Sequence, residues 1–146
     1  GGAARAVCAA LARAGAGEVD VLNRTPAKAE ALAARFGARA GSLEAAAALV
    51  SAADLVVNAT SVGLDGTGSP LPPGQRFKAG AWAYDLVYRP AETPFLRAAR
   101  EGGAGALGGM GMLVAQAAAT WRIWFGEIVP AVTADLVEKE LEGKLL

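Results

Sequence analysis

The chain has 146 residues, 53% of them apolar, and its 14 basic and 14 acidic side chains give a formal net charge of zero. This size predicts one domain with a sizeable core, and the balanced charge argues against a nucleic-acid partner, because a basic field normally supplies that affinity. There is no histidine and one cysteine, Cys8, so the commonest metal ligand is absent and a disulfide framework is excluded. No apolar run has the length of a membrane span. We therefore expect no metal and no membrane partner, a reducing, cytoplasmic setting, and Cys8 as a small core residue.

Taken in chain order, the hydrophobic pattern alternates between helices and strands. Helices are expected over 1–15, 25–37, 42–52, 93–103, 111–126 and 133–146, and strands over 18–23, 38–40, 54–60, 81–88 and 104–107. The helix over 25–37 has the clearest limits, because Thr25 suits an N-cap, Pro26 the first helical position and Gly37 the residue past the end.

This alternation predicts an α/β domain with a doubly wound parallel sheet, Rossmann-like, in three αβα layers. Polar side chains follow three of the predicted strands, in the segments NRT (23–25), NATS (58–61) and DLVY (85–88). Ligands of such sheets bind at the carboxyl ends of the strands, so these three segments predict a site.

The first residues fit the rear half of a glycine-rich dinucleotide-binding turn, although a flexible terminus explains them equally well. In such a turn, glycines let the backbone approach a pyrophosphate at a helix N-terminus. About 20 residues further on, an acidic side chain would bind the ribose hydroxyls of NAD, whereas an arginine accommodates the 2′-phosphate of NADP. This chain has Asn23-Arg24-Thr25 there, with Lys28 one turn along. These residues predict a phosphate clamp, with a helix cap and a solvated Arg24 as the alternative.

Five segments together resemble the C-terminal, NADP-binding domain of the shikimate dehydrogenase family. They are GGAARAV, NRTPAKA, NATSVG, DLVYRPAETPFLRAAREGG and GMGMLVAQAAATW, which begin at residues 1, 23, 58, 85 and 109. The resemblance spans essentially the whole chain, without the family's first strand and N-terminal substrate domain. It implies reduction of 3-dehydroshikimate to shikimate with NADPH, in the chorismate pathway of aromatic amino acid biosynthesis, by a monomer or homodimer.

The resemblance also implies roles for individual residues. Those implied for cofactor binding are Gly1, Gly2 and Ala3 at the pyrophosphate, Asn23, Arg24, Thr25 and Lys28 at the 2′-phosphate, Asn58, Ala59, Thr60 and Ser61 along the cleft, and Leu86, Gly109, Met112 and Leu113 at the nicotinamide. Tyr88 and Gln116 are implied to contact the substrate.

Most of these side chains also have an ordinary structural reading. Asn58 and Thr60 would close a turn, Tyr88 would be a partly buried core aromatic, and Met112 would be plain core. Gln116 lies on a helix of Ala, Val and Leu, where a buried amide needs a partner or a ligand.

Other residues stay outside the implied roles. Asp85 is either a site residue or a strand-end carboxylate bonded to local backbone. The large aromatic side chains are expected in the core or at a domain junction; they are Trp82, Trp121, Trp124 and Phe125.

The sequence departs from the family pattern in two ways. Gly108 stands where the family usually has an acidic residue, and Met110 where leucine is common. The family's catalytic Lys and Asp belong to the substrate domain, and no segment here matches it. Lys28 and Lys78 are poor substitutes, so we expect no catalytic residue in this chain and little or no activity from it alone.

We expect one domain over 1–146, with 127–146 forming a helix that packs back toward a substrate domain. Two rival hypotheses remain. One is a quinate/shikimate dehydrogenase that uses NAD, against which Arg24 argues. The other is a dinucleotide-binding module without catalysis, against which the presence of Tyr88 and Gln116 argues.

Overall fold

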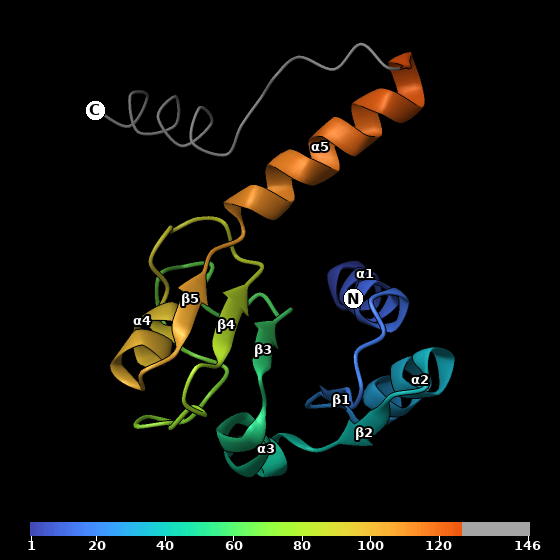
Figure 1. Ribbon diagram of the computed structural model, residues 1–146. Helices are drawn as coiled ribbons and strands as arrows, with labels where there is room; N and C mark the ends of the chain where they lie inside the picture. Colours follow the sequence, from blue (N-terminus) through green and yellow to red (C-terminus); the bar gives the residue numbers. More distant parts are fainter. Residues whose placement is uncertain (127–146) are drawn as a thin grey trace, which may run out of the picture.

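The computed structural model describes residues 1–126 and shows an alternating α/β chain (Figure 1). Its helices are α1 (Gly2–Arg13), α2 (Pro26–Phe36), α3 (Ala46–Ala52), α4 (Pro94–Glu101) and α5 (Met110–Phe125), with a 3₁₀ turn, η1 (Leu43–Ala45), before α3. Its strands are β1 (Asp20–Leu22), β2 (Arg39–Gly41), β3 (Leu55–Asn58), β4 (Trp82–Asp85) and β5 (Gly105–Leu107). The helix predicted within 127–146 lies outside the described residues.

The predicted order of elements is confirmed within residues 1–126, and the limits of α2 follow the expected signals. Thr25 is the N-cap residue, Pro26 opens the helix, and Gly37 ends it in the left-handed conformation with φ of 67°. The Thr25 hydroxyl makes no capping bond; instead, the backbone N–H of Thr25 donates to Asn23 Oδ1 at 2.9 Å. The single helix predicted over 42–52 is shorter, because its first turn is the 3₁₀ turn η1.

All strand pairs in the described residues are parallel, which confirms the predicted α/β class. The strands form two separate hydrogen-bonded sheets, β1–β2 and β3–β4–β5 (Figure 1). Within residues 1–126, β1 pairs only with β2 and β3 only with β4, so one edge of each strand has no partner strand. Helix α2 packs on β1 and β2, and α4 packs on β4 and β5.

The main hydrophobic core lies under the β3–β4–β5 sheet. Phe95, Leu96 and Ala99 of α4 are almost fully buried against this sheet, together with Phe77 and Ala83. The spacing of the apolar residues along α4 explains their burial, since residues three and four apart share one helix face. On the β1–β2 side, Cys8 is buried as predicted, and burial raises the pKa of its thiol.

The large aromatic residues do not lie in this core. Trp82 is 54% exposed and Trp124 71% exposed, and Trp121 and Phe125 are also largely exposed. None of the four therefore lies in the core that the described residues form, and the expected alternative, a position at a domain junction, stays a prediction. Three of them lie on α5, which projects away from the β3–β4–β5 sheet and buries Met110 alone (Figure 1). No helix within residues 1–126 combines the length and apolarity that crossing a bilayer requires.

Candidate functional site

The carboxyl ends of β3 and β4 meet at a buried carboxylate. Asn58 and Asp85 are register partners at the last positions of the two strands. Asp85 has 0% exposure, and its Oδ1 accepts hydrogen bonds from Asn58 Nδ2 and from the Val87 backbone N–H, both at 3.0 Å. Its Oδ2 accepts from Thr93 Oγ1 at 2.6 Å. The reading of Asp85 as a strand-end carboxylate bonded to local backbone is confirmed, and the carboxylate also binds two distant side chains.

Asn58 closes the turn after β3, as its structural reading predicted. Its Oδ1 accepts from the Thr60 backbone N–H at 3.1 Å and from Thr60 Oγ1 at 2.7 Å. Its Nδ2 donates to the Val62 carbonyl at 3.1 Å as well as to Asp85. The side chain of Asn58 is thus committed to the protein, and so is the Thr60 hydroxyl, which donates to Asn58 and accepts from the Val62 N–H at 3.1 Å. Thr60 and Ser61 are exposed at the surface of the turn.

The start of α5 is pressed against the end of β4. The Gly109 backbone N–H donates to the Val87 carbonyl at 3.2 Å, and a Cβ built on Gly109 would lie 2.5 Å from the Leu86 carbonyl oxygen. Only glycine permits this approach of two backbones. The structure therefore brings Leu86 and Gly109 together, next to Asn58, whose carbonyl accepts from the Leu86 N–H at 3.0 Å.

Tyr88 lies one residue beyond this junction. It is 40% exposed rather than a core aromatic, and it lines an open cavity of about 430 Å³. The cavity is shared with Arg89, Pro90 and the turn over 64–66. Tyr88 is therefore available to a ligand.

The three predicted site residues on α5 differ in their exposure to solvent. Met112 and Leu113 are half-buried. Gln116 is exposed, so it is not the buried amide that would need a partner within this chain, and its contact with the substrate stays a prediction. It is exposed because α5 is not covered along most of its length by the described residues.

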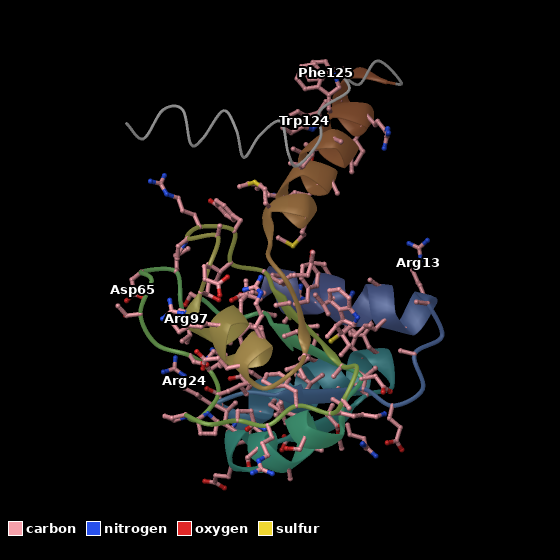
Figure 2. The ribbon with its side chains drawn as sticks, turned by 60° about the vertical axis from the view of Figure 1, so that its left-hand side comes forward. Arg13, Arg24, Asp65, Arg97, Trp124 and Phe125 are labelled. Atoms are coloured by element: carbon pink, nitrogen blue, oxygen red, sulfur yellow. The ribbon has the colours of Figure 1, made fainter. Side chains whose placement is uncertain are left out.

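The polar segment after β1 is open to solvent. Arg24, Thr25 and Lys28 are exposed, and no ion pair within residues 1–126 involves Arg24 or Lys28. Figure 2 shows Arg24 and Arg13 projecting outward on opposite sides of the view. Two free cationic side chains at the start of a helix can hold a phosphate dianion.

The N-termini of α1 and α2 differ in what they offer to an anion. Neither helix has an acidic residue in its first turn or a side-chain cap. The first N–H groups of α1 are therefore open to an anion such as a dinucleotide phosphate. At α2, Pro26 has no N–H, the Thr25 N–H donates to Asn23 Oδ1 and the Lys28 N–H donates to the Thr25 carbonyl at 3.0 Å, so the side chains would have to bind the anion there. At Gly1 and Gly2, a built Cβ would meet nothing within 4 Å, so the structure leaves open space there rather than a closed turn.

One residue of this site, Thr93, is not indicated by the sequence patterns. It is fully buried, bonds Asp85, and caps α4 by accepting the Leu96 N–H at 3.2 Å. A Thr-Pro pair before an amphipathic helix is an N-cap signal, but nothing in the local sequence indicates its bond to Asp85.

Parallel strands whose polar carboxyl ends meet helix N-termini define a nucleotide-binding α/β domain. Two family models match the chain: Shikimate / quinate 5-dehydrogenase over residues 1–64, and Shikimate 5′-dehydrogenase C-terminal domain over residues 109–142. The chain belongs to the shikimate dehydrogenase family.

Individual relatives agree with this assignment. The shikimate dehydrogenase (NADP(+)) of Moorella thermoacetica is 44% identical over 98% of this chain and 52% of its own length. A Thermus thermophilus shikimate 5-dehydrogenase, solved with NADP(H) and shikimate, is 49% identical with a TM-score of 0.75, over 86% of this chain and 46% of that one. A Corynebacterium glutamicum quinate dehydrogenase, solved with NAD, is 27% identical with a TM-score of 0.78, over 94% and 51%. The chain thus spans about half the length of the relatives it matches.

Proposed function

We propose that this chain is the cofactor-binding half of an NADP-dependent shikimate dehydrogenase, which reduces 3-dehydroshikimate to shikimate. The observation that carries the proposal is the free, exposed Arg24 at the carboxyl end of β1, where an NAD site would have a carboxylate. The names of the NADP-dependent relatives support it.

We assign the roles that the resemblance implies, and the placement of the residues supports them. Gly1, Gly2 and Ala3 begin α1 and would receive the pyrophosphate. Arg24, Thr25 and Lys28, with Asn23 holding their turn, would bind the 2′-phosphate. Bound NADPH supplies the hydride. The remaining implied residues would be Asn58, Ala59, Thr60 and Ser61 along the cofactor cleft, Leu86, Gly109, Met112 and Leu113 at the nicotinamide, and Tyr88 and Gln116 toward the substrate.

We further propose that the chain alone transfers hydride to dehydroshikimate poorly or not at all. The proton at the substrate oxygen requires a donor within hydrogen-bond reach. Lys78 is paired with Asp54, which precedes β3, so it lies at the amino end of the sheet, away from Asn58 and Tyr88. Following NADPH absorbance with dehydroshikimate tests this, and turnover at the rate of a complete enzyme would refute it.

The first experiment is calorimetric titration with NADP⁺ and with NAD⁺. We expect preference for NADP⁺, and Arg24→Ala should weaken NADP⁺ binding by about tenfold to a hundredfold while leaving NAD⁺ binding unchanged, because it removes charge-assisted bonds to the phosphate. Arg13→Ala is the matched control, since Arg13 is another exposed arginine, at the end of α1. Its NADP⁺ affinity should equal that of the unaltered chain.

The same titration tests the second candidate, a quinate/shikimate dehydrogenase that uses NAD. Similarity to the Corynebacterium glutamicum quinate dehydrogenase favours that candidate. Equal or tighter binding of NAD⁺, insensitive to Arg24→Ala, would support it and would reduce the Asn23–Thr25 segment to a helix start.

A further inference from the structure

We propose that Asp85 is a positioning residue, whose buried carboxylate fixes the end of β4 against the start of α5. In this way it holds the nicotinamide and substrate side of the site in register. The inference rests on the proposed function for the identity of the ligands, but the contacts that carry it belong to this chain alone.

The Asp85 carboxylate lies in an unusual environment. Asp85 is fully buried, and no described ion pair involves it. A buried carboxylate is costly unless hydrogen bonds satisfy it. Here an amide side chain, a backbone N–H and a hydroxyl do so. The Thr93 hydroxyl already accepts the Leu96 N–H, so its own proton is the one that reaches Asp85.

The hydrogen bonds of Asp85 hold three parts of the fold together. They tie together β3 through Asn58, α4 through its N-cap Thr93, and the backbone just past β4 through Val87. The Asp85 side chain therefore links β3, α4 and the backbone after β4. The residues that it binds there are 27, 8 and 2 positions away in the sequence.

The hydrogen bonds of Asp85 also extend to the residues of the candidate site. Val87, whose N–H binds Asp85, offers its carbonyl to Gly109, the residue before α5. Tyr88 follows Val87 directly, and Gln116 lies on α5. A shift of Val87 would therefore move Tyr88 and the start of α5 relative to each other. Arg24 lies in the turn after β1 and Lys28 in α2, next to the other sheet, and none of these bonds reaches them.

The test uses variants that keep the shape of the side chains. In Asp85→Asn, the new amide nitrogen would face the Thr93 hydroxyl, whose proton then loses its acceptor. Thr93→Val removes the hydroxyl, and Thr93→Ser keeps it. Asp54→Asn is the control, because it makes the same change at an 87% exposed carboxylate before β3.

The first readout is amide hydrogen exchange, which needs no ligand. We expect Asp85→Asn and Thr93→Val to speed exchange of the Gly109 and Val87 amides by about tenfold or more relative to the amides of β1 and β2. Thr93→Ser and Asp54→Asn should leave them unchanged. A uniform rise over the whole chain, or no rise at Gly109, would overturn the proposal. If Asp85→Asn does not fold, the comparison of Thr93→Val with Thr93→Ser decides it.

The second readout compares NADP⁺ with adenosine 2′,5′-bisphosphate, which is the adenosine half of the cofactor. The expected result for Asp85→Asn is NADP⁺ binding weakened by about tenfold, with bisphosphate binding within about twofold of the original. Equal weakening of both ligands would overturn the positioning role. If the unaltered chain binds neither ligand, the proposed function fails, and the exchange measurement still decides the role of Asp85.

Discussion

The β1–β2 region (residues 1–41) and the β3–β5 region (residues 55–110) are built differently. In the first, the buried side chains are small: Cys8, Ala29 and Ala33. The second buries large apolar side chains such as Phe95 and Leu96, together with the hydrogen-bonded group around Asp85. One region is a thin layer with exposed charges, and the other is a packed core.

This difference matches the two tasks that we propose for the regions. Long cationic side chains such as Arg24 bind a phosphate from the surface and tolerate small shifts of the backbone, because their reach is adjustable. Hydride transfer requires atoms within a narrow range of positions, so the residues around it need rigid support. The large buried side chains thus lie in the region where we propose that atoms must keep fixed positions. Four measurements can test this difference between the two regions.

The largest effect is expected from the core of the β3–β5 region. Leu96→Ala empties a fully buried position, and we expect a loss of about 2–5 kcal/mol in the free energy of unfolding. The matched change Leu32→Ala, at a half-buried position of α2, should cost less than about 2 kcal/mol. Urea unfolding of both variants measures this, and equal losses would remove the distinction between the regions.

The next effect comes from two glycines that oppose different neighbours. In Gly109→Ala the new methyl would meet the Leu86 backbone at 2.5 Å, so we expect a loss of about 1–3 kcal/mol. In Gly41→Ala it would meet Leu22 Cδ2 at 2.7 Å, which is the end of a side chain that can turn away. The cost there should stay below about 1 kcal/mol. A larger loss from Gly41→Ala would show that the β1–β2 region is the more tightly held.

The single thiol reports on opening of the β1–β2 region. Cys8 is buried, so a thiol reagent reaches it only when α1 opens, and its raised pKa keeps the thiol protonated at neutral pH. Because α1 buries little else, Cys8 should react about tenfold or more faster than global unfolding allows, a difference of about 1.4 kcal/mol. Labelling kinetics set against urea unfolding give the comparison. Labelling limited by global unfolding would contradict it.

The smallest effect concerns the ion pair on the β1–β2 surface. Arg39 donates two bonds to Asp20, each at 2.9 Å, and holds the pKa of that carboxyl below its ordinary value. A depressed folded-state pKa adds stability above the unfolded value of about 3.9, and this is lost as the pH falls through the folded pKa. Because Arg39 is more than half exposed, Arg39→Met should lower the Tm at pH 7 by no more than about 2 °C.

The pH profile provides the control for that prediction. The Tm difference between the Arg39→Met variant and the unaltered chain should shrink as the pH falls below the unfolded value, and it should vanish only below the depressed folded-state pKa of Asp20, where the carboxyl is protonated in both. A difference that persists in acid would assign the effect to lost packing of the arginine stem instead.

The sequence predicted much of the fold because its signals are local. Thr25, Pro26 and Gly37 mark the limits of α2 by their own conformational preferences, and the alternation of elements indicates parallel strands. The placement of Asn58 and Asp85 at strand ends was predictable for the same reason.

What could not be predicted depends on contacts between distant segments. The bond from Thr93 to Asp85 exists only once α4 has packed on β4, and no local pattern encodes it. The exposure of Gln116 and of the aromatic side chains on α5 likewise depends on what covers that helix, which apolar periodicity does not specify.

The unpartnered edges of β1 and β3 have a consequence for handling the protein. Leu55 on β3 is 42% exposed, and its strand presents backbone groups along one side without a partner strand in residues 1–126. Such an edge is a template for pairing between molecules. Concentrated solutions of the isolated chain should therefore scatter light increasingly with time, and a charged side chain in place of Leu55 should slow this.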